Sequence, residues 1–358
     1  MSLSDEIKDY DLETEVERLE KLLARKTALA DTRKAEIDRI RRSEETQNVE
    51  IERYKKMLGV IEQVNDAEPN IPKWVSPKKT KKSYVGQPTL LLSDLHFDEV
   101  VELDNIQGFN EYNRKIAVKR LGNVIDGTVQ VAKNHISNIE FEGFVLLLGG
   151  DILTGDIHEE LARTNEGPVA DSVVFWVGQL ASAIGHLADE FGRVFIPCVR
   201  GNHDRYGKKK QSKQQSQEAF TWIIYHWLQD HFANDDRVEF AISPSADYYF
   251  KAYNTKFLLT HGDQFRGGSG IAGIYSPIMR GAARKQQRNA SLEMPFDTVL
   301  MGHFHQLIFG SEILVNGSLK GYDEYAYDNN FAYEKARQAF WITTPEHGIT
   351  FPTAIYGD

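Results

Sequence analysis

Five short polar motifs carry the residues of this chain that are best suited to chemistry. Their carboxylates, single amide and several imidazoles are hard and borderline ligands, which suit Mn²⁺, Fe or Zn²⁺ better than Ca²⁺ or Mg²⁺ alone. Together they offer enough donor atoms for two neighbouring ions. In chain order the motifs are Asp94-Leu95-His96, Gly150-Asp151, Gly201-Asn202-His203-Asp204, His261-Gly262-Asp263 and Gly302-His303-Phe304-His305.

Each motif directly follows a short apolar run, so its side chains are expected where a buried strand ends and a loop begins. Asp151, for example, follows the apolar run Val145–Leu148 and two glycines. Strand ends of this kind gather on one edge of an α/β sheet, where open α/β folds place their ligands. We therefore predict that the five motifs converge, and that the two carboxylate oxygens of Asp151 bridge the two ions.

The elements that must position these motifs are strands and helices in alternation, which predicts an α/β domain over residues 88–358. The expected strands are Thr89–Leu92, Phe144–Leu148, Arg193–Val199, Tyr248–Tyr253, Lys256–Thr260, Thr298–Met301, Glu312–Val315, Ala339–Thr343 and Thr350–Tyr356. The expected helices are Ala117–Lys133, Ala170–Glu190 and Gln217–Phe232.

The first 65 residues differ from the rest of the chain. From Leu12 to Ile61 apolar residues recur in alternating steps of three and four, which is typical of a coiled coil. Polar seam positions at Glu44 and Gln47 leave a fold-back into a helical hairpin as an alternative, and a single solvated amphipathic helix as a second one. Residues 66–87, with three prolines and five lysines, are expected to form a linker.

Bulk composition sets broader limits. The 358 residues carry a formal net charge of −10, which argues against a surface that is basic throughout but allows a local basic patch. The single cysteine, Cys198, excludes an internal disulfide framework. We find neither a signal-peptide pattern at the start nor an apolar run of membrane-spanning length, so we expect a cytoplasmic protein without membrane contact.

The ordered motifs resemble those of the calcineurin-like metallophosphoesterases, whose pattern is D-x-H, GD, GNH[DE], a His beside Gly, and GHxH. The resemblance spans residues 88–358 and implies a four-layer α/β/β/α sandwich. It assigns to the first metal ion Asp94, His96 and His305. It assigns to the second ion Asn202, His261 and His303. Asp151 is shared between both ions, and His203 protonates the leaving group. We expect Mn²⁺ at both positions, with Fe or Zn²⁺ as alternatives.

Two such cations would hold a bridging hydroxide near neutral pH and neutralise charge on the phosphate, so no Ser or Cys nucleophile is required. An imidazole such as His203 can donate a proton at a pKa near the working pH. Asp204 is expected to hold the nearby loop or the ring. His158 is a candidate for substrate contact, and the remaining histidines are expected at the surface or at helix caps: His135, His186, His226, His231 and His347.

Two features depart from the family pattern. Phe97-Asp98-Glu99 stands where many members carry a small residue, and its acidic charge would repel a polyanion or recruit another cation. The stretch Asp98–Asn113 looks like an added loop that covers the cleft.

Basic residues favour nucleic acid as the substrate, because they follow two of the motifs and can attract phosphates toward the metals. The candidate contacts are Arg205, Lys208, Lys209, Lys210 and Arg266, with a further cluster at Arg280, Arg284, Lys285 and Arg288. The alternative is a solvated loop, since the run 208–217 contains little besides Lys, Gln and Ser.

Three functions follow from these patterns. We expect a phosphodiesterase or nuclease that self-associates through its N-terminal helix. Hydrolysis of a small cyclic nucleotide or of a phosphomonoester is the second hypothesis. The third is a non-catalytic scaffold that uses the N-terminal helix to bind partners.

Overall fold

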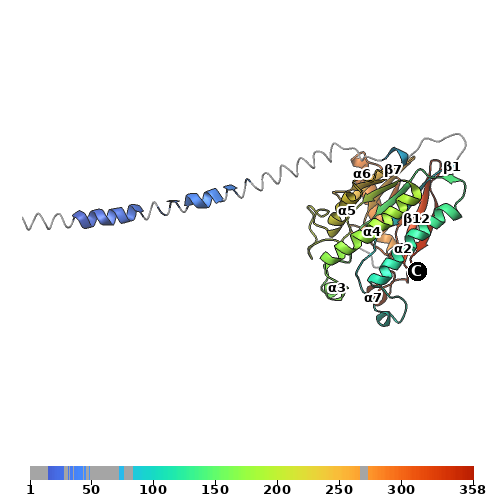
Figure 1. Ribbon diagram of the computed structural model, residues 1–358, viewed down its shortest axis with the longest axis horizontal. Coiled ribbons are helices and arrows are strands. Elements are labelled where there is room, and N and C mark those ends of the chain that lie inside the picture. The colour runs from blue at the N-terminus through green and yellow to red at the C-terminus, as the bar shows by residue number, and fades with distance from the viewer. Residues whose placement is uncertain are drawn as a thin grey trace, which may run out of the picture. The chain divides into compact units, whose positions relative to one another are not determined.

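The computed structural model describes residues 15–266 and 273–358, apart from gaps at 28–30, 32, 35, 43, 46–47, 49–71 and 76–83. The chain divides into two units, Met1–Glu68 and Pro69–Asp358, which we describe separately (Figure 1). In the first unit residues 15–27 are helical, and so are the described residues between 31 and 48. Leu19 and Leu23 are 57% and 67% exposed there. The rest of the expected coiled coil, including Gln47 and Ile61, lies outside the described residues, so helix pairing stays a prediction.

Part of the expected linker belongs to the second unit. The short 3₁₀ helix η1 (Lys73–Val75) buries Val75 completely, in a core against which Trp74 also packs. Strand β1 (Tyr84–Val85) pairs in parallel with β3 (Ile139–Glu140). The sequence did not reveal these contacts because their partners lie far along the chain.

A six-stranded sheet forms the larger half of the second unit. Its order is β13 (Gly348–Tyr356), β12 (Arg337–Thr344), β2 (Gln87–Leu92), β4 (Phe144–Leu148), β5 (Val194–Cys198) and β6 (Val238–Ile242). β2, β4, β5 and β6 are parallel neighbours, and the first three of them are buried along their whole length. This explains their unbroken apolar runs, because a strand covered on both faces has no solvated side to carry polar residues.

A five-stranded sheet forms the other half. Its order is β10 (Ile308–Phe309), β11 (Ile313–Val315), β9 (Thr298–Met301), β8 (Thr255–Thr260) and β7 (Asp247–Ala252). The central strands β11, β9 and β8 are parallel, whereas β10 and β7 pair antiparallel at the edges.

The alternation of side chains along β2 directs them into two different cores. Leu90 and Leu92 face helices, in a core shared with α2 (Arg114–Gln130), α4 (Val169–Phe191) and α5 (Phe220–His231). Leu91 instead shares a core with Phe257 of β8 and Trp341 of β12, so this core joins the two sheets. Helix α6 (Tyr275–Ser291) buries its Ile278 and Ala282 against β8, β9 and β11. In Figure 1 helices α2 and α4 run in front of the sheets, and α6 lies at the upper end of the unit.

The mixed α/β class is therefore confirmed, and each of the nine expected strands and three expected helices has a counterpart. The sequence did not predict β6, β10 or α6. It also did not predict the short elements η2 (Leu103–Ile106), α3 (Glu159–Thr164) and α7 (Glu324–Asp328), or the π-helical geometry of η3 (Val131–His135), whose first three residues lay in an expected helix. Within the described part of the chain, no helix has the length and apolar content needed to cross a membrane.

Candidate metal centre

The five motifs lie at the carboxyl ends of five parallel strands in the two sheets. Asp94 and His96 follow β2, Asp151 follows β4, and Asn202 follows β5. From the second sheet, His261 follows β8, and His303 and His305 follow β9. Because neighbouring parallel strands end on the same edge, the fold brings together side chains that lie more than 200 residues apart in the sequence.

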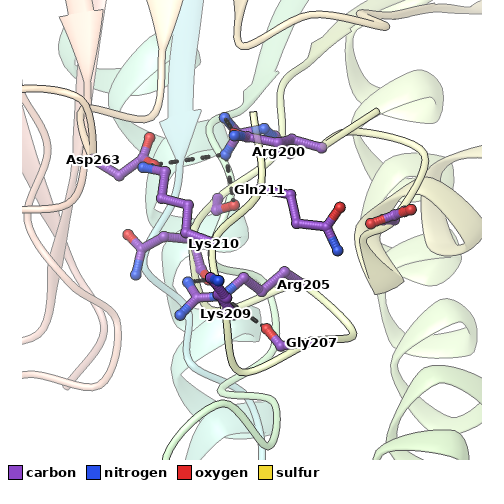
Figure 2. Close-up of a pocket in the computed structure, with 11 residues that line it drawn as sticks. Arg200, Arg205, Gly207, Lys209, Lys210, Gln211 and Asp263 are labelled. Carbon is purple, nitrogen blue, oxygen red and sulfur yellow. Dashed lines mark hydrogen bonds and ion pairs between the residues drawn. The ribbon is translucent and has the colours of Figure 1, made fainter. Parts of the chain in front are cut away.

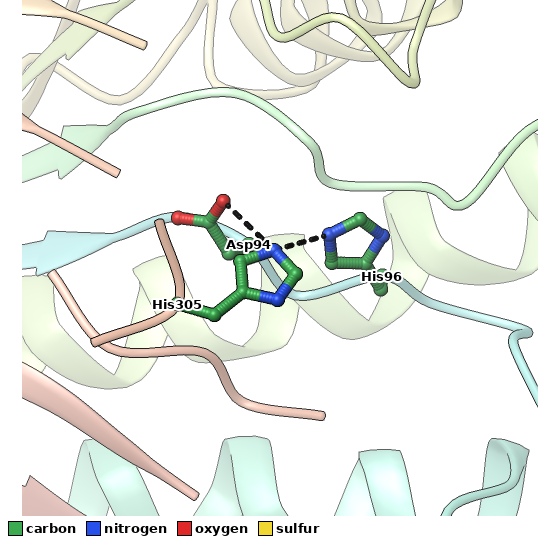
Figure 3. Close-up of side chains that lie close together, drawn as sticks. All are labelled: Asp94, His96 and His305. Atoms are coloured by element: carbon green, nitrogen blue, oxygen red, sulfur yellow. Dashed lines mark hydrogen bonds and ion pairs between the residues drawn. The ribbon is translucent and has the colours of Figure 1, made fainter. Parts of the chain in front are cut away.

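Asp94, His96 and His305 form the first group of donor atoms (Figure 3). Nε2 of His96 lies 3.0 Å from Nε2 of His305, which in turn lies 3.5 Å from Oδ1 of Asp94. Two imidazole nitrogens and a carboxylate oxygen thus point at one another. Asp94 and His96 are buried, and burial lowers the pKa of His96 well below its usual value, which favours the neutral imidazole that metals bind.

Asp151, His261 and His303 form the second group, with Asn202 beside them. Nδ1 of His261 donates to the carbonyl oxygen of Gly149 at 2.9 Å, so in the neutral ring Nε2 carries a lone pair. That nitrogen lies 2.9 Å from Oδ2 of Asp151 and 3.1 Å from Oδ1 of Asn202. Three acceptor atoms converge here, so a metal ion or a proton between them is needed to offset their repulsion.

Electrostatics at the second group agree with this geometry. Burial alone lowers the pKa of His261, but the adjacent Asp151 carboxylate outweighs it and raises that pKa to about 10. The site therefore attracts a cation strongly at this nitrogen. A divalent ion would fit the same three atoms, and binding it would release the proton.

Asp151 lies between the two groups. Its Oδ2 is 2.9 Å from Nε2 of His261 and 4.0 Å from Nε2 of His96. Its other oxygen, Oδ1, accepts a hydrogen bond from the backbone N–H of His203 at 2.7 Å. The structure thus brings six of the seven expected ligands into these two groups and places Asn202 beside the second, while Asp151 lies within 4.0 Å of an imidazole of each group.

The backbone that carries these ligands is strained. The φ angles of Asp94, His96 and Asp151 are 53°, 46° and 50°, in the left-handed region that residues other than glycine seldom adopt. His303 and His305 have φ angles of 71° and 54°. Strain of this kind persists only where surrounding contacts enforce it, and it is concentrated at functional sites.

Asp204 provides several of the contacts that hold the strained backbone of the loop after β4. Its buried carboxylate accepts backbone N–H groups from Gly201 at 2.9 Å and from Asp151 at 2.8 Å. It also accepts from Ile152 and Leu153, at 3.1 and 3.3 Å. Asp204 therefore ties the loop after β4 to the loop after β5, as expected for a loop-holding residue.

Two glycines permit the close approach of the loops. A Cβ atom at Gly302 would lie 2.0 Å from Oδ2 of Asp94. A Cβ atom at Gly201 would lie 2.0 Å from Oδ1 of Asp151. In both cases the missing side chain leaves the space that a candidate ligand occupies.

His203 lies beside the first group, with its ring 4.8 Å from that of His96. Its Nδ1 donates to the carbonyl oxygen of Thr154 at 3.1 Å, which fixes the ring and leaves Nε2 as the nitrogen that can exchange a proton. Burial lowers its pKa, and the Asp151 carboxylate opposes that effect. Exposed His158, at the start of α3, lies 5.7 Å from the His203 ring and is the other imidazole near this edge.

The expectation that Asp98 and Glu99 add free acidic charge to the site was wrong. Both carboxylates are buried and paired: Asp98 with Arg114 at 2.7 Å, and Glu99 with Lys320 at 2.7 Å. Lys320 also pairs with Asp323 at 2.5 Å. Neither acid is therefore available to repel a polyanion or to bind a further cation.

Glu99 instead supports a ligand. Its Oε2 accepts the hydroxyl of Thr154 at 2.9 Å and lies 3.6 Å from Nδ1 of His96. A carboxylate behind one ring nitrogen orients the other nitrogen toward a metal. Sequence reasoning missed Thr154, Lys320 and the role of Glu99, because no spacing in the sequence indicates their proximity. It also missed Ser93, whose hydroxyl donates to Oδ2 of Asp94 at 2.5 Å.

The added loop Asp98–Asn113 is packed into the fold. Val101, Ile106 and Tyr112 are buried in the core beneath the helices. The hydroxyl of Tyr112 donates to the carbonyl oxygen of Leu95, between the ligands Asp94 and His96, at 2.6 Å. The loop therefore supports the ligand-bearing backbone, and its expected role as a cover gains no support from these contacts.

Three of the five expected basic contacts, Arg205, Lys209 and Lys210, line a small hollow that also includes Asn202 (Figure 2). Arg205 and Lys209 line it, but the guanidinium of Arg205 donates to the backbone carbonyls of Asn202, Gly207 and Lys208. Lys210 pairs with Asp263 inside the hollow. Lys208 pairs with Glu159 at 2.9 Å. Arg266 lines a separate hollow beside α6.

The histidines expected outside the site lie away from both groups. His135, His186, His231 and His347 are exposed, as predicted. His226 is the exception, because it is partly buried and contacts Trp222 edge-on at 4.5 Å.

No protein-family model and no curated protein matches the chain. Solved structures do. A predicted phosphoesterase from Streptococcus pneumoniae TIGR4 has 12% identity over 76% of this chain and 98% of its own, with a TM-score of 0.28. Vacuolar Protein Sorting 29 from Cryptosporidium parvum has 11% identity over 76% and 98%, with a TM-score of 0.30.

A dimetal phosphatase from Danio rerio has 12% identity over 76% of this chain and 99% of its own, with a TM-score of 0.34. Two of these three proteins are described as a phosphoesterase or a phosphatase.

Proposed function

We propose that this protein hydrolyses phosphoester bonds with two divalent metal ions, in a four-layer α/β/β/α metallophosphoesterase sandwich. The observation that carries the proposal is the placement of Asp151 between two groups of metal-ligand side chains. The two sheets joined by a common core, with helices packed on the other side of each, support the layered fold.

Seven of the candidate residues would bind the metal ions, and one would transfer a proton. Asp94, His96 and His305 would hold one ion, Asn202, His261 and His303 the other, and Asp151 both. When bound, the ions supply Lewis acidity toward the phosphate oxygens and an activated water as nucleophile. His203, fixed through Nδ1, has its Nε2 left to protonate the departing oxygen.

The substrate class that we favour is a phosphodiester of nucleic acid. Arg205 and Lys209 line the hollow that includes Asn202, so cationic groups lie beside the candidate centre. A small cyclic nucleotide or a phosphomonoester is the second candidate. It is favoured because the guanidinium of Arg205 and the ammonium of Lys210 already have partners within the chain, so fewer cations are left to bind a phosphate backbone. Mn²⁺ is our first choice of metal, because the donor set mixes carboxylates with imidazoles.

Turnover of two aryl esters tests the proposal. We expect the full chain with Mn²⁺ to hydrolyse bis-p-nitrophenyl phosphate faster than p-nitrophenyl phosphate, and excess chelator to abolish both reactions. A faster reaction with the monoester would favour a phosphomonoesterase. Binding of two metal equivalents without turnover of either ester would refute the proposal and favour the scaffold.

A further inference from the structure

Helix α6 carries an unusual charge for a protein of this composition. The chain has a formal net charge of −10, yet Tyr275–Ser291 contains three arginines, one lysine and no acid. The apolar part of its buried face is small, with Ile278 and Ala282 packed on the five-stranded sheet. The opposite face is exposed and basic.

The cations of α6 divide into two kinds. Lys285 is buried, and both it and Arg288 pair with Asp247 of β7, which fixes the helix to the sheet. Arg280 and Arg284 are exposed, and neither forms an ion pair with any residue that the structure describes. They are four positions apart, so their side chains emerge on the same face one turn from each other.

Arg280 and Arg284 line a hollow of about 200 Å³ together with Arg266, which comes from the loop after β8. The guanidinium of Arg280 donates to the backbone carbonyl of Arg266 at 3.3 Å, which holds the two sides of the hollow together. Among the residues that the structure describes, no Asp or Glu lines it. Arginine suits such a site because its planar fork of donors matches phosphate oxygens.

A second observation points to an anion. Gln264 also lines the hollow, and its side-chain nitrogen is buried without a hydrogen-bond partner among the described residues. A buried N–H group left unpaired costs free energy, so an acceptor oxygen in the hollow would stabilise it. The preceding residue, Asp263, lines the hollow that includes the candidate ligand Asn202. Consecutive residues of the chain therefore line the α6 hollow and the hollow that includes Asn202.

We propose that the face of α6 carrying Arg280 and Arg284, with Arg266 opposite, binds the phosphate backbone of a nucleic-acid strand. This inference rests on the proposed function, because the strand bound by α6 is the substrate that the metal centre would cleave. The face offers positive charge and planar donors that match phosphate oxygens, which every strand carries whatever its sequence, so we expect it to bind the backbone.

Binding of a fluorescein-labelled 20-nucleotide single-stranded DNA, followed by anisotropy in EDTA so that no cleavage occurs, tests this proposal. We expect Arg280→Gln/Arg284→Gln in the full chain to weaken binding about tenfold or more at low salt. The slope of log affinity against log salt should fall by roughly one to two, since each lost phosphate contact removes about 0.7 from it for single strands.

The matched control is Lys115→Gln/Lys119→Gln, which removes the same charge at the same spacing from exposed positions of α2, a helix that packs on the other sheet. We expect this variant to bind the DNA like the parent. Unfolding temperatures measured by circular dichroism show whether each variant is folded.

Two outcomes would overturn the inference: equal weakening in both variants, or unchanged DNA binding after Arg280→Gln/Arg284→Gln. Loss of binding to phosphatidylserine vesicles with DNA binding intact would reassign the face to a membrane surface. The proposed function fails separately, if the parent chain with Mn²⁺ does not hydrolyse bis-p-nitrophenyl phosphate.

Discussion

At the scale of single residues, the position of Asp151 decides whether two ions are held or one. Replacing Asp151 with Asn keeps the shape but removes the negative charge that lies between the two groups. We expect bound metal to fall below two equivalents and turnover of bis-p-nitrophenyl phosphate to fall by more than about 100-fold. Asp156→Asn, at an exposed position nearby, should change neither quantity. Two metal equivalents retained in the Asp151 variant would contradict the shared position.

His203 and His158 are the two imidazoles that can donate a proton at this edge, and their variants distinguish them. p-Nitrophenolate leaves without protonation, whereas a nucleoside alkoxide needs a proton. His203→Ala should therefore slow cleavage of a dinucleotide by about 10²–10⁴-fold and affect the aryl diester much less. His158→Ala should slow both substrates to a similar, smaller extent. If His158→Ala shows the selective loss instead, the acid is His158.

The buried Lys320 compensates two acids beside the metal centre. Burial alone lowers the pKa of its ammonium, but Asp323 and Glu99 outweigh that effect and raise it well above its usual value. Lys320→Met leaves both carboxylates buried without a counter-charge, so we expect a loss of about 3–5 kcal/mol in the free energy of unfolding by urea at pH 7. Lys335→Met, at an exposed position, serves as the control.

The loss of stability caused by Lys320→Met should depend on pH. Burial raises the pKa of Asp323, but Lys320 outweighs it and holds that pKa below its usual value, so the parent loses stability only as the pH falls through this low value. Without Lys320 the pKa is raised, and the variant gains stability as the pH falls toward about 4. The difference in the free energy of unfolding between parent and variant should therefore become smaller as the pH falls from 7 to 4. A constant difference would show that packing, not charge, accounts for the loss.

At the scale of elements, the closeness of the two sheets depends on glycines at the strand ends. Gly302→Ala places a Cβ atom where Oδ2 of Asp94 lies, directly after β9. We expect bound metal to fall from two equivalents toward one, as measured by mass spectrometry of the metal content, with turnover reduced accordingly. Gly185→Ala in α4 meets no neighbouring atom and should raise stability by about 1 kcal/mol without loss of metal. Parent metal content in the Gly302 variant would contradict the argument.

Elements with a strong local pattern were predictable from sequence. The bounds of β4 and β9 agree with the prediction residue for residue, because both strands are buried along their whole length, are apolar apart from Thr298, and are followed directly by a glycine. β6 was missed because it lies at a sheet edge, and its five half-buried residues include Glu239. α6 was missed because only a few of its side chains are apolar and buried, and its arginines dominate the pattern.

The candidate ligands were predictable for a different reason: their types and order are unusual enough to stand out without any contact. The residues that support these ligands were not predictable from the sequence. The partner of Asp98 lies 16 residues away and that of Glu99 lies 221 residues away, so no local pattern shows that both charges are neutralised. The left-handed φ angles of Asp94 and His96 are likewise set by the packing of two loops, which the sequence does not display.

At the scale of the whole molecule, charge is distributed unevenly. Although the chain is acidic, arginines without an ion pair lie around the α6 hollow. Near the candidate centre, Arg114 neutralises Asp98 and Lys320 neutralises Glu99. An overall negative charge limits non-specific attraction to polyanions, whereas local cations still attract phosphate near the metals. Salt should therefore weaken nucleic-acid binding strongly, yet alter turnover of a small aryl diester little.

The N-terminal helix bears on the state of assembly. Within the described part of the first unit, the apolar seam is exposed: Leu19 by 57% and Leu23 by 67%. An apolar stripe at this spacing is stabilised by a second helix, so we expect the full chain to self-associate. Leu19→Ser/Leu23→Ser should lower the sedimentation coefficient toward that of a monomer and leave turnover of bis-p-nitrophenyl phosphate unchanged. Glu17→Ser/Lys21→Ser removes an ion pair of 2.8 Å from the same helix and should leave association intact. Identical sedimentation of the parent and the seam variant would refute pairing between chains through this stripe and leave the helical hairpin and the single solvated helix as the explanations.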